Sequence, residues 1–197
     1  MTIDAKMVMQ LRQLTGAGLM DAKGALSETD GDVQAAAELL RKKGVAKASK
    51  KAERETREGR VYAYIHANGR VGSMVEVLCE TDFVARTDQF AALCHDLAMH
   101  VAASDPLYVK PEDVPAAVVE KEKEIYREEM AGQAKPLDII EKIVEGKLNK
   151  YFSDVCLLRQ SFVKDEDKTV EEVVKEKIAA LGENIQVSRF SRFNLGA

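Results

Sequence analysis

Two alternating stretches joined by a tight turn constrain the fold of this chain more than any other feature. "VYAYIH" (61–66) and "VGSMVEVLC" (71–79) place apolar residues at every second position, which is the period of a β-strand with one buried face. Between them, "ANGR" (67–70) contains Asn-Gly, the pair that best fits a two-residue hairpin turn. The sequence therefore predicts a β-hairpin in the first half of the chain.

Helical patterns precede this hairpin. Residues 3–44 contain three short apolar stripes, separated by the turns "TGAG" (15–18) and "TDGD" (29–32). Asp32 can cap the third helix and Gly44 can end it. The segment therefore predicts a small three-helix module. Its apolar stripes are Val8, Leu11 and Leu14, then Leu19, Met20, Ala22 and Leu26, then Val33, Ala36, Ala37 and Leu40.

Helices and further strands follow the hairpin. The pattern predicts a helix over 84–102, a proline-containing loop over 104–115, helices near 116–131 and 136–152, a strand over 155–163, a helix from a Thr169–Glu172 capping box to Leu181, and a strand over 184–193. The buried stripes are expected at Phe90, Leu93, Leu97 and Val101, and at Ile139, Ile140, Ile143 and Val144. This order predicts an α+β domain in which helices cover a small, mainly antiparallel sheet.

A strongly basic stretch lies between the predicted three-helix module and the predicted α+β domain. Residues 41–60 hold nine basic and three acidic side chains, a local net charge of +6 in a chain whose total is −4. We interpret the stretch as a partly helical linker, although an RNA-binding segment is the alternative. The predicted divisions are a three-helix module (1–45), a basic linker (46–60) and an α+β core (61–197).

The apolar runs, the first residues and the cysteines of the chain indicate the cellular compartment in which it is expected. No stretch approaches 18 apolar residues, so no membrane span is expected, and "MTIDAKMVMQ" (1–10) does not resemble a secretory signal. Cys79, Cys94 and Cys156 are an odd and scattered set, which favours free thiols over a disulfide framework. A cytoplasmic protein is therefore expected.

Signals of catalysis are weak throughout. "GAG" (16–18) lacks the third glycine and the preceding strand of a dinucleotide site, and the chain contains no phosphate-binding loop of the Walker type. Cys94, His95 and His100 lack metal-ligand spacing and are interpreted as a packing cysteine beside two surface or boundary histidines. The sequence predicts no catalytic residue, no metal site and no cofactor. An enzyme using Cys94 and His95 is the remaining alternative of that class.

"CETDFVAR" (79–86) concentrates charge, a hydroxyl and an aromatic ring where the second strand of the hairpin ends. Thr81 or Asp82 can cap the following helix, which accounts for a polar residue there. Phe83 fits either a core anchor or a protruding wedge, and periodicity does not decide between them. The corner is the candidate functional segment.

Four segments in order resemble the bacterial elongation factor Ts family. They are "LTGAGLMDAKGAL" (14–26), "KKGVAKASKKAERETREG" (42–59), "CETDFVAR" (79–86) and "IAALGENIQVSRF" (178–190). The resemblance implies an N-terminal module of the ubiquitin-associated type and nucleotide exchange on elongation factor Tu, in its GDP-bound and nucleotide-free forms. It also implies that Thr81, Asp82, Phe83 and Val84 displace Mg²⁺ from that partner, and that Met20 and Lys23 make a second contact.

Two departures from the family qualify this resemblance. Gly24 stands where a lysine is common, which removes a charge from the "MDAK" helix. The chain also resembles one half of the core of longer members, so the resemblance implies a homodimer formed around the strands expected at 155–163 and 184–193. Neither a membrane nor direct nucleic-acid binding is expected.

Overall fold

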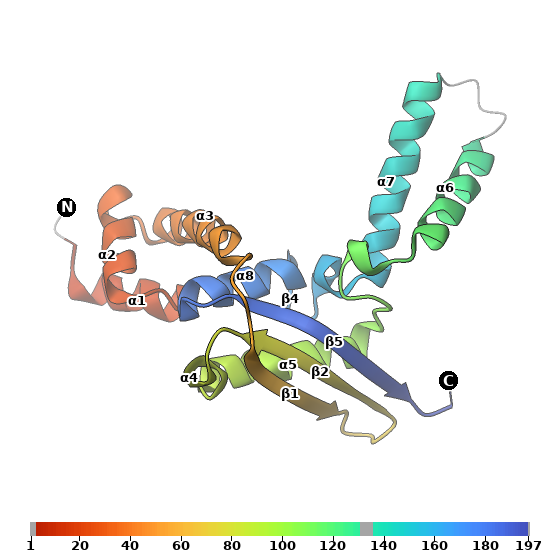
Figure 1. Cartoon of the computed structure of the whole chain (residues 1–197). Coiled ribbons are helices and arrows are strands. Elements are labelled where there is room, and N and C mark those ends of the chain that lie inside the picture. The colour runs from red at the N-terminus through yellow and green to blue at the C-terminus, as the bar shows by residue number, and fades with distance from the viewer. Residues whose placement is uncertain (1–2, 131–135, 197) are drawn as a thin grey trace. The chain divides into compact units, whose positions relative to one another are not determined.

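The computed structural model describes residues 3–130 and 136–196, which form helices and strands in the order shown in Figure 1. The chain divides into two compact units. The first unit contains residues 1–62, 76–95 and 172–187, and the second contains residues 63–75, 96–171 and 188–197. Each unit is described by itself below.

Three helices open the first unit, as the sequence predicted: α1 (Ala5–Thr15), α2 (Leu19–Glu28) and α3 (Val33–Lys51). The Asp32 carboxylate accepts hydrogen bonds from the N–H groups of Gln34 and Ala35, which confirms the predicted cap of α3. The module has a small core of Val8, Leu11, Ala22, Ala25, Leu26 and Ala36. Three residues of the predicted stripes, Leu14, Leu19 and Met20, are exposed instead. The likeness to the ubiquitin-associated type remains a prediction.

The sequence predicted that helix α3 ends at Gly44, but the helix continues to Lys51. Alanine and lysine are strong helix formers, and together they outweigh one glycine, which costs about 1 kcal/mol inside a helix. Gly44 is buried, and a Cβ atom added there would lie 3.1 Å from Cβ of Ala179 in α8 (Val170–Leu181). The glycine therefore serves close packing of two helices, and the first part of the basic stretch is helical.

The predicted hairpin is present as β1 (Glu58–Ile65) and β2 (Val71–Cys79). Strand β5 (Ile185–Asn194) completes a three-stranded sheet in the order β1-β2-β5. The N–H of Leu195 bonds the carbonyl of Arg70, while the N–H of Asn184 bonds Glu80, so β5 runs antiparallel to β2. The small antiparallel sheet expected from the sequence is confirmed.

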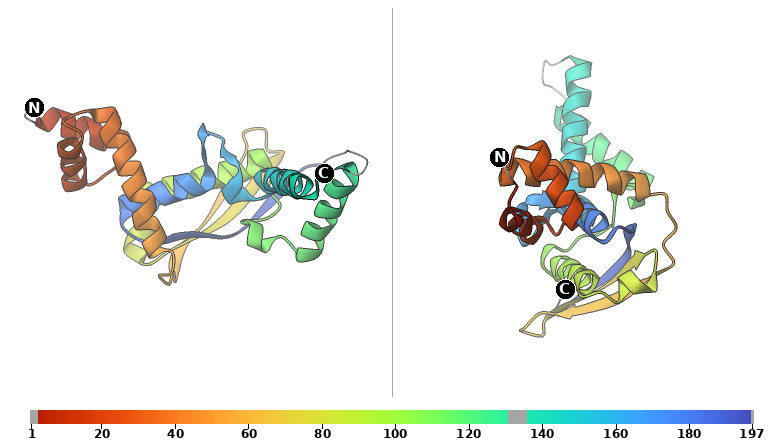
Figure 2. Two further views of the ribbon diagram at one scale, coloured as in Figure 1. Left: turned by 90° about the horizontal axis from the view of Figure 1, so that it is seen from above. Right: turned by 90° about the vertical axis from the view of Figure 1, so that its left-hand side faces the viewer.

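Helix α5 (Asp88–Ser104) lies along one face of this sheet (Figures 1 and 2). Its predicted stripe is confirmed, because all four members are at most 1% exposed: Phe90, Leu93, Leu97 and Val101. The hydroxyl of Ser73 in β2 donates to the carbonyl of Ala98 at 2.5 Å and joins strand to helix. The buried, alternate side chains of β2 lie on the face of the sheet that α5 covers.

The helix expected over 84–102 is broken into α4 (Asp82–Ala85) and α5. Thr87 explains the break. Its hydroxyl donates to the carbonyl of Val84 at 2.8 Å and accepts from the N–H of Phe90 at 3.2 Å, so it ends one helix and caps the next. The result is a single helical turn that begins at Asp82, shortly after the end of β2.

The strand expected over 155–163 was wrong. Helix α7 (Leu137–Val155) reaches the start of that range, and residues 157–159 form the 3-10 helix η2 (Leu157–Arg159). The range contains one short strand, β3 (Ser161–Phe162), and an isolated parallel bridge between Cys156 and Tyr108. Strand β3 pairs antiparallel with β4 (Asp165–Thr169), which the sequence did not predict because all of its residues are polar. A continuous apolar run without alternation does not distinguish these states.

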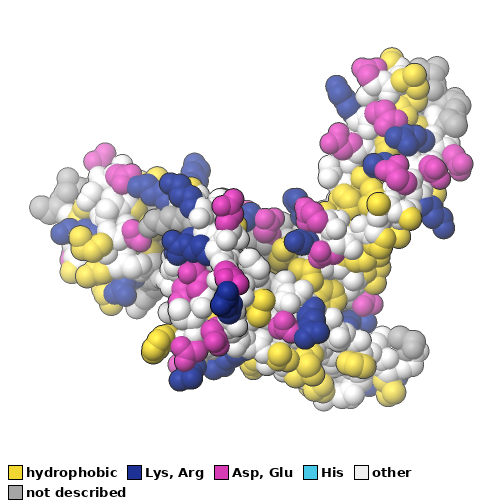
Figure 3. Space-filling view, viewed as in Figure 1, with side chains coloured by type: hydrophobic (Ala, Val, Ile, Leu, Met, Phe, Trp, Pro, Cys, Tyr) yellow, Lys and Arg dark blue, Asp and Glu magenta, His cyan; other side chains and the backbone are white. Residues whose placement is uncertain are grey.

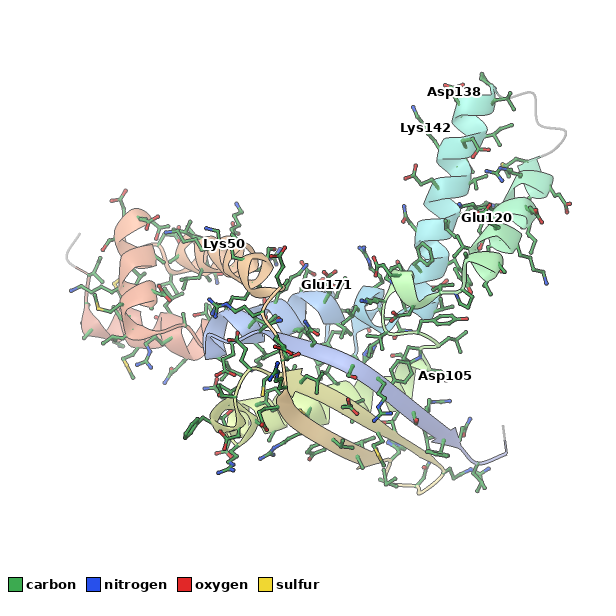
Figure 4. The ribbon with its side chains drawn as sticks, viewed as in Figure 1. Lys50, Asp105, Glu120, Asp138, Lys142 and Glu171 are labelled. Carbon is green, nitrogen blue, oxygen red and sulfur yellow. The ribbon has the colours of Figure 1, made fainter. Side chains whose placement is uncertain are left out.

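Helices α6 (Ala116–Met130) and α7 confirm the two helices predicted after the loop, which itself contains the 3-10 turn η1 (Pro111–Asp113). They pack against each other in the second unit, and Arg127 and Glu141 pair across them at 2.8 Å. Both helices carry exposed charged side chains, among them Glu120, Asp138 and Lys142 (Figure 4). Among the residues predicted to be buried, Val144 is buried but Ile139 is exposed.

Candidate functional site

The corner at residues 79–84 is built on a capped helical turn. The hydroxyl of Thr81 accepts a hydrogen bond from the N–H of Val84 at 3.4 Å, and the Thr81 carbonyl accepts from the N–H of Ala85. Thr81 is therefore the N-cap of α4, which confirms the capping role predicted for this position. Ala85 is buried and holds the turn against the body of the first unit.

Phe83 projects from this turn. Its side chain is 80% exposed, so the interpretation as a core anchor was wrong and the protruding alternative agrees with the structure. Ala85, two residues later, fills the buried position instead. A large aromatic side chain in water on a capped turn is available for insertion into a partner.

Asp82 lies beside Phe83 and pairs with Arg86, with 2.9 Å between the carboxylate and the guanidinium. The pair is one helical turn apart and partly exposed, so it contributes little to stability. The pair holds the Asp82 carboxylate towards Arg86, one turn further along the chain. Val84 is half-buried at the base of the turn. All four residues predicted for this site therefore lie together.

Glu183 supports the corner from the segment between α8 and β5. Its carboxylate accepts hydrogen bonds from both the hydroxyl of Thr81, at 2.6 Å, and the N–H of Thr81, at 3.0 Å. We had not predicted this residue as part of the site. The available signal was that "IAALGENIQVSRF" (178–190) contains an acidic residue directly after a helix-ending glycine.

Met20 and Lys23 lie on α2 and not at the corner. Both are exposed, and their spacing of three residues places them on one side of the helix. Met20 is 75% exposed, and three more apolar side chains of this module are also exposed: Met9, Leu14 and Leu19. Gly24 lies inside α2, and a Cβ atom added there would have no neighbour within 4 Å.

Comparison with known proteins identifies the family. A statistical model described as "Elongation factor TS" matches residues 33–197. The elongation factor Ts of Thermosipho melanesiensis is 57% identical over 194 residues, which cover 98% of this chain and 99% of that protein. The protein of the same name from Fervidobacterium nodosum is 55% identical over the whole length of both chains, and that from Geobacter sulfurreducens is 56% identical over 100% of this chain and 91% of its own.

This chain belongs to the elongation factor Ts family. The match covers the corner, α8 and β5, so the candidate site lies within the part of the chain that defines the family.

Cys94 and His95 of α5 are held in packing contacts. Burial raises the pKa of the Cys94 thiol to about 12, with Arg60 opposing the rise, so the thiol is protonated at neutral pH. His95 packs edge-on against Tyr62 with ring centroids 5.7 Å apart. Across residues 3–130 and 136–196, no group of three or more His, Cys, Asp or Glu side chains is placed to hold a metal ion.

His100 is fully buried, contrary to the surface or boundary position we expected. Its Nδ1 accepts from the N–H of Val163 at 3.2 Å, so Nε2 carries the proton and donates to Oε1 of Gln160 at 3.0 Å. Desolvation by burial lowers the pKa of His100, and the bond to Gln160 partly opposes this. The histidine is a neutral structural link between α5 and the segment around β3.

Part of the basic stretch 41–60 is neutralised locally. Lys43 pairs with Glu28, Arg54 with Glu80 and Arg57 with Glu55, whereas Lys50 is exposed on α3 (Figure 4). These pairs reduce the charge available to an acidic partner. In the described part of the chain, no helix is both long enough and apolar enough to cross a membrane.

Proposed function

We propose that this chain speeds the release of GDP from elongation factor Tu by inserting the corner of Thr81, Asp82, Phe83 and Val84 beside the bound Mg²⁺ and phosphates. Membership of the family supports the broader role, which is guanine nucleotide exchange on elongation factor Tu during translation elongation. The observation that supports the corner as the active element is Phe83, 80% exposed on a capped turn.

The chemistry of the partner explains why such a corner is sufficient. A GTPase holds GDP largely through backbone N–H groups around the phosphates and through Mg²⁺, whose charge offsets theirs. A rigid aromatic wedge displaces a segment of the partner, and a neighbouring carboxylate such as that of Asp82 disturbs the hydrogen bonds and waters that support the ion. No bond is made or broken in the exchange factor itself, so we propose that the chain is not an enzyme and uses no cofactor.

Exchange then follows from differential binding. A factor that binds nucleotide-free elongation factor Tu more tightly than the GDP-bound form weakens GDP binding, and GDP weakens factor binding by the same ratio. A hundredfold antagonism corresponds to about 2.7 kcal/mol of coupling free energy. A buried aromatic contact with one charged neighbour supplies a term of this size.

Met20 and Lys23 are proposed as a second contact with the same partner. Their exposure on α2 supports this role, since an apolar side chain and a cation are offered together on one side of the helix. Gly24 brings no charge to that side, which makes this contact weaker than one with lysine at the same position.

A homodimer is proposed through the second unit. An apolar groove of about 510 Å³ lies between the ends of the hairpin strands and the end of β5, where hydrophobic side chains gather in Figure 3. Its lining includes Ile65, Met74, Phe193 and Leu195, all of them exposed. Contiguous exposed apolar surface favours burial against another surface, and a second copy offers the same groove across a two-fold axis. We place both the dimer and its exchange activity in the cytoplasm.

The test follows release of a fluorescent GDP analogue from elongation factor Tu, with excess unlabelled GDP, as the factor is titrated. We expect strong acceleration by the wild type and its loss in the Asp82→Ala, Phe83→Ala double variant, with circular dichroism unchanged. Leu137→Ala is a matched control, because Leu137 is 81% exposed but lies on α7. Acceleration that survives in the folded double variant would remove the corner from the mechanism, and no acceleration by the wild type would remove the proposed function.

A further inference from the structure

The turn between α8 and β5, residues 182–184, touches two segments that are distant in sequence. Gly182 has a φ of +81°, a conformation that favours glycine, and its N–H ends α8 on the carbonyl of Ile178. Two polar residues follow directly, the half-buried Glu183 and Asn184, which is 1% exposed. A buried polar side chain at a turn requires hydrogen-bond partners.

On one side, the turn holds the residues immediately before Asp82. The Glu183 carboxylate accepts from the hydroxyl and the N–H of Thr81, and the N–H of Asn184 donates to Oε1 of Glu80 at 2.6 Å. The acceptor in each of these bonds is a carboxylate, and hydrogen bonds to a carboxylate are stronger than those between two neutral groups. Three hydrogen bonds therefore fix the backbone and side chains from which the single helical turn of α4 starts.

On the other side, the turn holds the last residue of α3 and the segment that follows it, residues 51–54, here called the connector. Nδ2 of Asn184 donates to the carbonyls of Arg54, at 2.8 Å, and Ala52, at 3.3 Å. Nζ of Lys51 donates to the carbonyl of Gly182. The guanidinium of Arg54 also lies 3.4 Å from the Glu80 carboxylate, so the connector and the corner meet directly as well.

We propose that Glu183 and Asn184 are positioning residues for nucleotide exchange, which hold the corner and the connector in one fixed relation. The inference rests on the proposed function of the corner. The connector continues from α3 and therefore from the module that carries Met20 and Lys23. One turn thus sets the geometry of both partner contacts within the first unit.

Pre-organisation makes a specific kinetic prediction. At saturating factor, every partner molecule is bound, but only complexes with Phe83 in the inserted position release GDP quickly. Loosening the corner lowers the fraction of such complexes, so the maximal release rate falls while the half-saturating concentration changes little. A variant that only lowers the fraction of folded factor has the opposite effect. Its half-saturating total concentration rises, while its maximal release rate stays unchanged.

The experiment measures GDP release from elongation factor Tu over a full titration of each full-length variant. Glu183→Ala is expected to lower the maximal rate about tenfold. Glu183→Gln should recover most of this loss, because its amide can accept from the N–H of Thr81 and donate to the hydroxyl. Asn184→Ala tests the connector side and should also lower the maximal rate. Glu145→Ala, an exposed glutamate of α7, is the control for charge removal.

A double-variant cycle separates this effect from general destabilisation. Thr81→Val combined with Glu183→Ala should be less slow than the product of the two single effects, because both variants remove the hydrogen bond between the Thr81 hydroxyl and the Glu183 carboxylate. The proposal is overturned if Glu183→Ala reaches the wild-type maximal rate, at any concentration, or if the two effects multiply. If the wild type itself fails to accelerate release, the proposed function falls and this inference with it. A slow Phe83→Ala variant beside a fast Glu183→Ala variant would overturn the inference alone.

Discussion

Two exposed phenylalanines in this chain have opposite surroundings. Phe83 is 80% exposed on the turn of α4, with the Asp82–Arg86 ion pair beside it. Phe193 is 70% exposed near the end of β5, in a groove lined with other apolar side chains such as Ile65. Exposure alone does not distinguish the two rings.

The residues around Phe83 and around Phe193 favour different kinds of protein contact. A single aromatic ring among charges, on a turn fixed by Glu183, is suited to insertion into a pocket of another protein. A ring within a continuous apolar surface is suited to a flat interface, where area and not one side chain provides the affinity. The comparison therefore supports the proposal of an exchange element in the first unit and of a self-association surface in the second.

The largest expected effect is on exchange by the first ring. Phe83→Ala should lower the maximal rate of GDP release about hundredfold, corresponding to about 2.7 kcal/mol of lost coupling. Stability should change by less than about 0.5 kcal/mol, because an exposed side chain contributes little to folding. Stopped-flow release and urea unfolding measure the two quantities. Phe193→Ala, assayed at the same protomer concentration, is the control and should release GDP nearly as fast as the wild type.

The second ring should govern self-association. Phe193→Glu places a charge in the apolar groove, and we expect the dimer dissociation constant to rise at least tenfold, or about 1.4 kcal/mol. Sedimentation velocity over a range of concentrations gives this constant. Phe83→Glu should sediment like the wild type. A wild type that stays monomeric at every concentration would contradict the assignment of the groove.

Acid should affect the second unit before the first. His100 is neutral in the fold with its pKa lowered by burial, whereas in the unfolded chain it titrates near 6.5. The unfolded state therefore binds the extra proton first, so this contribution is complete above about pH 6.5 and decreases as the pH falls below that value, by at most about 1.4 kcal/mol per pH unit.

Urea unfolding at pH 7.5 and pH 5.5 should show this loss, and His100→Gln should reduce the pH dependence. His66→Gln, at an exposed histidine of the hairpin turn, should retain it. Hydrogen exchange at pH 5.5 is expected to rise at β3 and β4 before it rises at residues 79–86. Equal slopes for the wild type and His100→Gln would remove His100 as the origin.

The smallest expected effect concerns the thiols. All three cysteines are free and buried, and burial raises the pKa of Cys79 and of Cys156 to about 11 and that of Cys94 to about 12. Iodoacetamide at pH 7.5 should therefore label the native protein slowly and leave GDP release unchanged at low labelling. Mass spectrometry reports the labelling. Rapid loss of exchange with labelling of Cys94 would revive a thiol-based activity.

Local patterns predicted the parts of the fold that depend on neighbours in sequence. The alternation around Asn-Gly gave β1 and β2, the 3.6-residue stripe gave α5, and Asp32 gave the start of α3. These features are determined by a few consecutive side chains, so the sequence was sufficient. The strand predicted over 155–163 failed because two buried neighbours, Cys156 and Leu157, have no alternation to separate a strand from a 3-10 turn.

The candidate site was predicted in part. Thr81 or Asp82 was expected as a helix cap, and the structure has Thr81 in that position. Resemblance to a family singled out Phe83, because periodicity did not decide whether its side chain is buried or exposed. Glu183 and Asn184 were missed because their partners, Thr81 and Arg54, lie more than 100 residues away. Contacts of this kind arise from the tertiary fold, and one sequence carries no pattern that pairs them.

The most direct test of the central claim is thermodynamic. Isothermal titration calorimetry would measure the affinity of the factor for nucleotide-free and for GDP-bound elongation factor Tu, with the wild type and with Phe83→Ala. If the corner couples the two binding sites, the ratio of the two affinities is about one hundred for the wild type and falls towards one for the variant. A ratio that is the same for both proteins would show that Phe83 does not mediate the antagonism between factor and nucleotide.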